Sequence, residues 1–444
     1  IDGNVTLRNA APTIFVDGRP TTLTLDQIPA DAIESVEIIT NPSAKFDASG
    51  GTAGILNVVL KKNRKAGYNG NIRAGIDSRG KINAGGDINI KQGKFNFFLG
   101  LDLRQRKSLS EGHTYRENIY SNKLQNTILD QSSNSTNTGQ FLFGRIGFDY
   151  LMDNRNSLTL SMSLPNGEFN SSQVDNIHID TMSSPVKTQD AIRTTVNKRN
   201  FKNFGPALGY KHLFPKQGRE LTADFNYNTS SNSGSGDYTT QYYNTNGSIL
   251  GDPALQRLTS SGSSTYWTVQ SDYTSPVGKG KFESGLRAAV RDNKNVNDNA
   301  AFDYDLNKFI IIPSASSNYK YTDEVYAAYS TYSNKLGENF SYQLGLRAES
   351  SQYRGTLLST GETFSNKYPI EFFPSVFVTQ TLSPGQDMQL NYSRRINRPN
   401  FWQQIPYYDV SDLLNIRVGN PGLKPEFTNS FELNYSKSLG SGHS

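Results

Sequence analysis

The segment SLTLSMSL, residues 157–164, alternates polar and apolar side chains without interruption. Leu158, Leu160, Met162 and Leu164 share one parity, and the residues between them are serines and a threonine. Successive side chains of a β-strand point to opposite faces. The segment therefore predicts a strand with one apolar face and one polar face.

The same two-faced pattern recurs along the chain after Gly67. Residues 95–103 place phenylalanine and leucine opposite asparagine, glycine and aspartate, with Phe98 as the one exception, and residues 340–349 repeat the pattern. Further examples are residues 221–227, 388–392 and 431–435. A single segment of this kind fits any half-buried antiparallel sheet, so the connections between segments decide the class of fold.

These connections alternate between short and long. The short ones are residues 92–93, 152–156, 215–218, 275–278, 336–339 and 382–386, and the long polar ones are 109–138, 167–199, 233–261, 293–319, 353–366 and 397–426. Transmembrane β-barrels have short turns at one rim and long loops at the other. The pattern therefore predicts a transmembrane antiparallel β-barrel with about fourteen strands of roughly 9 to 15 residues. The alternative is a large secreted antiparallel β protein, which has no reason to keep this parity.

Composition narrows the class further. Hydrophobic residues make up 35% of the 444 residues, and no window reaches the roughly 18 consecutive apolar residues of a membrane helix. There are no cysteines, which excludes disulfides and thiolate metal sites. The net charge is +5 with dispersed lysine and arginine, which disfavours nucleic acid as a partner. Tyr150, Tyr227, Tyr392 and Tyr435 lie toward strand ends, where aromatic girdles form.

The segment before Gly67 follows a different pattern. Residues 13–16, 35–40 and 55–60 are short β-prone runs, and Pro29 suits the start of a short helix. Turn signals and glycines separate these runs. This predicts a small mixed α/β piece. Because it joins directly to a wide barrel, we expect it to be a plug inside the lumen.

Two stretches resemble a known family. Residues 16–63, VDGRPTTLTLDQIPADAIESVEIITNPSAKFDASGGTAGILNVVLKKN, resemble the second half of the plug of TonB-dependent outer-membrane receptors. FFPSVFVTQTLSPGQDMQLNYSRRINRPNFWQQIPYYDV, residues 372–410, followed by GNPGLKPEFTNSFELNYS, resembles the late-barrel signature of the outer-membrane β-barrel branch common in Bacteroidota.

The resemblance implies two parts, with residues 1–66 as the C-terminal part of the plug domain and 67–444 as the N-terminal part of the barrel. Receptors of this family have a TonB box and a complete plug, so the resemblance implies a TonB box and the first half of the plug before Ile1. Their barrels have about twenty-two strands, so it also implies further strands after Ser444. The location implied is the bacterial cell outer membrane, where the protein would be integral and in contact with lipid.

The function implied is active uptake of a large solute, energised by the TonB–ExbB–ExbD complex. A surface lipoprotein or a larger outer-membrane complex is a further candidate partner. The alternative function is an accessory or structural barrel subunit without uptake. Iron chelates, glycans, peptides and cobalamin-like ligands all remain open as substrates. We expect no enzyme activity, catalytic residue, metal site or cofactor, because no motif for any of them is present.

Candidate ligand contacts come from three places. The resemblance puts a plug loop at residues 19–23, with Arg19, Thr21 and Thr22. Arg104 and Arg347, together with Asp102, Arg145 and Glu349, are expected to face the lumen, where pairing of buried charges is the commoner role. The aromatic residues Trp402, Tyr407 and Tyr408 lie in a late loop, where packing of the loop is the alternative to stacking on a ligand.

Overall fold

The structure is a computed structural model. It describes residues 5, 12–16, 19–20, 25, 33–39, 44–46, 55–60, 67–120, 125–182, 187–399, 401–405, 408–409 and 417–438. The expected helix at Pro29 lies outside these ranges. Among the described residues, no helix has the length and apolar character needed to cross a membrane.

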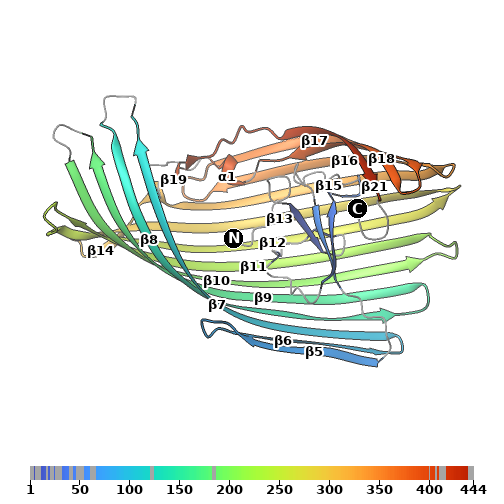
Figure 1. Ribbon diagram of the computed structural model, residues 1–444, viewed down its shortest axis with the longest axis horizontal. Coiled ribbons are helices and arrows are strands. Elements are labelled where there is room, and N and C mark those ends of the chain that lie inside the picture. Colours follow the sequence, from blue (N-terminus) through green and yellow to red (C-terminus); the bar gives the residue numbers. More distant parts are fainter. Residues whose placement is uncertain are drawn as a thin grey trace.

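One large antiparallel sheet dominates the molecule (Figure 1). Fourteen strands of the described chain pair in a single path, each with its neighbour in chain order, and β14 (Lys308–Ile311) pairs with β13 beside it. The strands of the path are β5 (Gly67–Ile76), β6 (Ile82–Gln92), β7 (Phe95–Asn118), β8 (Thr127–Leu151), β9 (Asn156–Thr181), β10 (Lys187–Leu213), β11 (Glu220–Tyr243), β12 (Ile249–Val277), β13 (Gly280–Asp303), β15 (Ser317–Leu336), β16 (Phe340–Leu357), β17 (Thr363–Ser383), β18 (Gln386–Asn397) and β21 (Glu426–Lys437). The strands predicted from alternation are confirmed.

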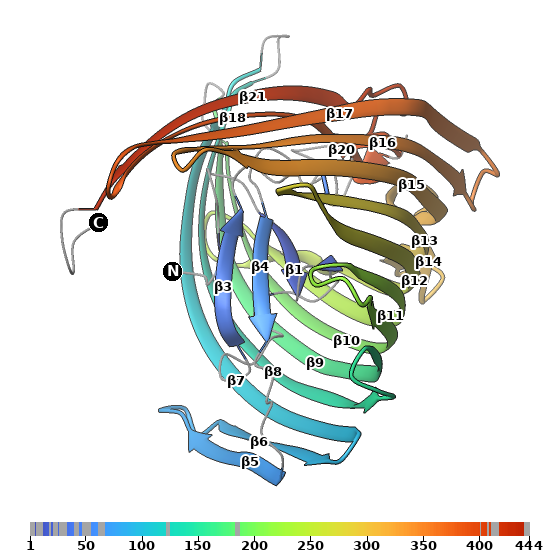
Figure 2. The same ribbon diagram turned by 90° about the vertical axis from the view of Figure 1, so that its right-hand side faces the viewer.

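A second, four-stranded sheet lies inside the curve of the large one (Figure 2). Its order is β2-β1-β4-β3, with β1 (Thr13–Val16) parallel to β4 (Ile55–Leu60), and with β2 (Arg19–Pro20) and β3 (Ile33–Ile39) antiparallel to their partners. We call it the N-terminal sheet. Leu56 and Val58 form its buried centre. The three short β-runs predicted before Gly67 are confirmed, with β3 starting two residues earlier than expected.

The large sheet has two chemically different faces. On the convex face, one cross-strand row runs from Ile90 through Phe97, Phe148, Leu160, Leu208, Phe225 and Val269. Most of these side chains are exposed in the isolated chain. An exposed apolar band of this extent is the surface that a lipid bilayer covers. Its borders carry aromatic pairs, since Phe95 stacks on Tyr150 at 4.8 Å and Tyr227 faces Trp267.

The strands are longer than predicted. β7 to β13 each have between 24 and 29 residues, because the strands continue through much of the polar stretches assigned to long loops. Residues 109–118 pair with 127–136, for example, and residues 233–240 pair with 254–261. The prediction of 9 to 15 residues therefore holds for β5, β6, β18 and β21 and is wrong for the other strands of the path. Backbone ladder bonds form regardless of side-chain polarity, so a hairpin extends beyond the point where the apolar pattern ends.

The remaining short elements lie between the main strands. A 3₁₀ turn, η3 (Pro313–Ala315), precedes β15. Between β18 and β21, the chain forms the short helix α1 (Phe401–Gln404), β19 (Tyr408–Asp409) and β20 (Arg417–Val418). All six short connections predicted from the sequence lie at turns between consecutive strands, at the end of the sheet opposite the long hairpin tips (Figure 1).

Candidate functional site

The concave face of the large sheet is the candidate functional surface. It carries charged side chains such as Asp102, Arg347 and Glu349, and the N-terminal sheet lies against it (Figure 2). Lys45 Nζ lies 3.7 Å from Glu283 Oε1 on β13. A Cβ built on Gly345 of β16 would lie 2.9 Å from Ala44 Cβ. These contacts place residues 44–45 directly on the wall, low on the sheet near the short turns.

A buried ionic network lies on the concave face of β16. Arg347 Nε donates to Glu349 Oε1 at 2.5 Å, and Arg398 Nη2 donates to Glu349 Oε2 at 2.6 Å. Arg398 Nε also donates to Ser351 Oγ at 3.2 Å. The side chains of Arg347 and Glu349 are 2% and 0% exposed. Burial of this kind is tolerated because both carboxylate oxygens of Glu349 are paired.

The segment that follows β18 folds back onto this wall. Gln404 is fully buried, donates to the Pro399 carbonyl at 2.7 Å and accepts from Asn366 Nδ2 at 3.2 Å. Ile405 packs in a cluster made largely of tyrosines, with Tyr319, Tyr321, Tyr353 and Leu357. Arg398 and Ile405 therefore attach this segment to β15 and β16 through one ionic and one apolar contact.

The structure places the predicted ligand contacts far apart. Arg104 is on the concave face of β7, 3.6 Å from Asp102, with a side chain 41% exposed. Arg347 is on the same face but on β16, far from β7 in the strand order, and its charge is paired with that of Glu349. Thr21, Thr22 and Tyr407 lie outside the described residues. The backbones of Arg19 in β2, Trp402 in α1 and Tyr408 in β19 are placed, and ligand contact by these residues stays a prediction.

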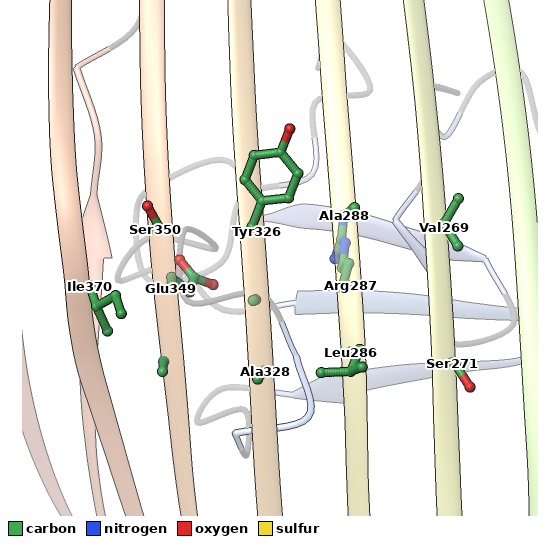
Figure 3. Close-up of a pocket in the computed structure, with 12 residues that line it drawn as sticks. Val269, Ser271, Leu286, Arg287, Ala288, Tyr326, Ala328, Glu349, Ser350 and Ile370 are labelled. Carbon is green, nitrogen blue, oxygen red and sulfur yellow. The ribbon is translucent and has the colours of Figure 1, made fainter.

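A hollow of about 530 Å³ lies on the opposite, convex face (Figure 3). Its small floor residues include Ala288, Ala328 and Ala348, and its walls include Leu286 and Ile370, which are exposed. The N-terminal sheet is behind the strands in this view. The hollow is thus part of the apolar band and is separate from the concave surface.

Sequence reasoning missed several residues of the concave face. Ser351, Arg398 and Gln404 were not singled out, because their partners come from segments distant in the chain. A cluster of phenylalanine and arginine side chains on β7–β10 was also missed. Its signal was the repeated Gly-x-Phe at Gly139–Phe141 and Gly167–Phe169. In the described part of the chain, no group of three or more histidine, aspartate or glutamate side chains is arranged to hold a metal ion.

Comparison with known proteins agrees with this geometry. The chain has the fold of a membrane barrel wall, apolar outside and polar inside. The model of the outer membrane protein beta-barrel family matches residues 212–442, and the chain belongs to that family. It is accordingly an integral protein of the bacterial outer membrane. No curated protein sequence matches the chain.

Several solved structures match the chain, and the copper transporter OprC shares its fold. The copper transporter OprC matches with a TM-score of 0.56 and 10% identity, over 97% of this chain and 62% of that chain. The chain thus spans less than two thirds of the length of that protein. The ferric yersiniabactin uptake receptor FyuA from Yersinia pestis matches with a TM-score of 0.28 and 10% identity, over 95% of this chain and 80% of that chain. The siderophore receptor PirA from Acinetobacter baumannii matches with a TM-score of 0.22 and 10% identity, over 96% and 90%.

Proposed function

We propose that this protein is an outer-membrane transporter that takes up a large solute and is energised through TonB. Residues 1–66 act as part of a plug, and residues 67–444 act as part of the barrel wall. The observation that carries the proposal is the position of the N-terminal sheet inside the curve of the large sheet, with residues 44–45 on the wall. The copper transporter OprC, which shares the fold, is also a transporter by name.

The contacts of the N-terminal sheet suit a part that moves. The Lys45–Glu283 pair is 3.7 Å long, and the lysine side chain is 42% exposed. Ion pairs of this kind contribute about 0 to 1 kcal/mol. A pull transmitted from TonB would therefore separate this contact easily, while the ladder of the large sheet stays intact. The work is a rearrangement of the N-terminal sheet and involves no chemical step.

The experiment is a reversible tether. The chain has no cysteine, so the double substitution Ala44→Cys/Gly345→Cys introduces a single pair. A Cβ on residue 345 lies 2.9 Å from Ala44 Cβ, and a small outward shift of residue 44 gives the roughly 3.5 to 4.5 Å that a disulfide spans. Cells with and without the gene are first compared for uptake of ferric chelates, glycans, peptides and cobalamin. The oxidised double variant should then lose uptake of the responsive solute, and a reductant should restore it.

Each single-cysteine variant is the matched control, and its uptake should be the same under oxidising and reducing conditions. A Cβ at residue 345 lies 2.5 Å from Ser375 Oγ, so the uptake of Gly345→Cys alone is the reference for the double variant. Uptake that continues at the wild-type rate through a fully oxidised tether would refute movement of this contact. If none of the four solute classes depends on the gene, the transport proposal fails and an accessory role in a larger outer-membrane complex takes its place.

A further inference from the structure

We propose that the concave face of β7–β10 carries a binding site for an organic anion with a flat aromatic group. This inference rests on the proposed function and adds a substrate class to it. The site consists of Arg106 on β7, Phe141 on β8, Phe169 on β9, and Phe201 and Arg199 on β10. We call these five residues the Phe–Arg patch.

Strand register brings the patch together. One cross-strand row runs from Arg106 through Gly139 and Phe169 to Arg199. The neighbouring row runs from Arg104 through Phe141 and Gly167 to Phe201. Both rows lie on the same face of the sheet as Asp102 and Arg145. Cross-strand pairing from β7 to β13 puts Glu283 on this face too, and Glu283 contacts Lys45, which lies close to the N-terminal sheet in the chain. The patch is therefore on the lumen side.

Two of the three phenylalanine rings lie over glycines and are nearly parallel to each other. A Cβ built on Gly139 would lie 2.4 Å from Phe169 Cδ1, and one built on Gly167 would lie 2.4 Å from Phe201 Cε1. The ring centroids of Phe169 and Phe201 are 6.1 Å apart with an interplanar angle of 10°. Phe141 lies 6.1 Å from Phe201. All three side chains are only partly buried, so apolar rings face the lumen.

The charge in the two rows of the patch is entirely positive. The concave-face positions of these two rows are 104 and 106 on β7, 139 and 141 on β8, 167 and 169 on β9, and 199 and 201 on β10. They carry Arg104, Arg106 and Arg199 and no carboxylate. Arg104 is near Asp102, but among the described residues no carboxylate pairs with Arg106 or Arg199. The Arg106 guanidinium lies 5.5 Å from the Phe169 ring centroid.

This combination of residues favours one class of ligand. Partly exposed rings bind a flat aromatic group by stacking, and the arginines beside them bind a carboxylate, sulfonate or phenolate. Arginine pairs with planar anions through its fork of N–H donors. Arginine over an aromatic ring also occurs at Arg145–Phe98 and Arg193–Tyr238 on the concave face. On the convex face, Arg257 lies 4.3 Å from the Phe309 ring centroid. There, however, Asp237 neutralises the arginine at 2.7 Å. The two unpaired arginines distinguish the Phe–Arg patch.

The test measures binding to the purified full-length protein in lipid nanodiscs by calorimetry. The probes are 2-naphthoate, its neutral analogue 2-naphthamide, and acetate, which has the charge without the ring. We expect 2-naphthoate to bind about tenfold more tightly than either of the others. Arg106→Gln/Arg199→Gln should reduce 2-naphthoate binding to the level of 2-naphthamide, and Phe169→Leu should weaken both naphthyl probes.

Two controls keep the result interpretable. Arg257→Gln removes the same kind of contact on the convex face and should bind like the wild type. Arg106→Lys/Arg199→Lys keeps the charge and should retain preference for the anion. If the glutamine variant does not fold, salt replaces it, because added salt should weaken 2-naphthoate binding and leave 2-naphthamide unchanged.

Equal affinity of the wild type for 2-naphthoate and 2-naphthamide would overturn the inference, as would unchanged binding in Arg106→Gln/Arg199→Gln. Because binding is measured without uptake, this failure is separate from a failure of the transport proposal. A protein that binds 2-naphthoate through the arginines but takes up no solute keeps the site and loses the transport function.

Discussion

Glu349 is the residue on which the buried charges of β16 depend. It accepts from Arg347 and Arg398 at 2.5 and 2.6 Å, and its side chain is 0% exposed. The network also fixes the segment after β18, because Arg398 belongs to that segment. Removing the carboxylate charge leaves two guanidinium groups in a place with little access to water.

We expect Glu349→Gln to lower the free energy of unfolding by about 3 to 5 kcal/mol, the range for breaking a buried ion pair. The measurement is urea unfolding of the protein in detergent micelles. Glu324→Gln is the matched control. Its pair with Arg354 at 2.6 Å is exposed at the arginine end, so its loss should change stability by at most about 1 kcal/mol. Similar effects for both variants would contradict the assigned role.

His178 marks a second residue-scale feature, on the convex face of β9 beyond the apolar band. Its Nδ1 lies 2.6 Å from Asp190 Oδ1 on β10, and its Nε2 lies 3.4 Å from Asp180 Oδ2. The hydrogen bond with Asp190 is the main cause that raises the pKa of His178 above its ordinary value. Its register partner on β8, Asp130, pairs with His113 Nε2 at 2.6 Å. The histidines thus lie among three carboxylates.

A raised pKa means that protonated His178 stabilises the folded hairpin. This contribution is complete below the unfolded pKa of about 6.5 and is lost as pH rises through the higher folded value. We expect amide hydrogen exchange in β9 and β10 near His178 to speed up between pH 6 and pH 8, after correction for intrinsic exchange. His178→Gln should remove most of this pH dependence, and an unchanged profile in that variant would show that other groups cause it.

At the scale of elements, the long hairpins consist of two parts with separate roles. On β11 and β12, the apolar convex band ends at Tyr227 and Trp267, while pairing continues to Thr240 and Ala254. The lower part crosses the membrane, and the upper part is held mainly by its own ladder. A polar upper part should therefore be dispensable for insertion.

We expect a variant that lacks residues 233–261, with Asn232 and Gly262 joined by Asn-Gly, to insert in the outer membrane at wild-type levels. Asn-Gly suits the two-residue hairpin turn that this junction requires. Insertion is measured by heat-modifiable migration of outer-membrane fractions on gels. A deletion of equal length that includes residues 221–227 removes membrane-spanning pairs and should abolish insertion. Loss of insertion in the first variant would show that the upper ladder is required for assembly.

At the scale of the whole molecule, removal of the N-terminal sheet should change the ion conductance of the protein. We expect deletion of residues 1–66 from the full-length protein to raise ion conductance in planar bilayers well above that of the wild type, because the wall would then surround open space. The Ala44→Cys/Gly345→Cys tether should leave the low wild-type conductance unchanged. Equal conductance of the deletion and the wild type would mean that the N-terminal sheet does not close the lumen.

Sequence predicted the strands and the short turns well, because alternation such as that of residues 157–164 reflects the faces of a strand directly. It failed for the hairpin extensions. Serine, threonine and asparagine on both faces carry no alternation, although their backbones pair as well as any others. It expected Arg347 and Glu349 on the lumen side with pairing as the commoner role, but it found neither Arg398, the third member of that network, nor the Phe–Arg patch. Both depend on which residues face each other across strands, and register between strands is not readable from one segment.

The continuous ladder of the hairpins also bears on how a solute is captured. A disordered loop that closes over a ligand loses conformational entropy, on the order of 1 kcal/mol for each backbone residue that becomes fixed. The extensions of β7–β12 are already paired for most of their length, so contact with them imposes little of this penalty. The affinity of these hairpins for a solute should thus depend on the contacts that they make with it, because binding requires little further ordering of the chain.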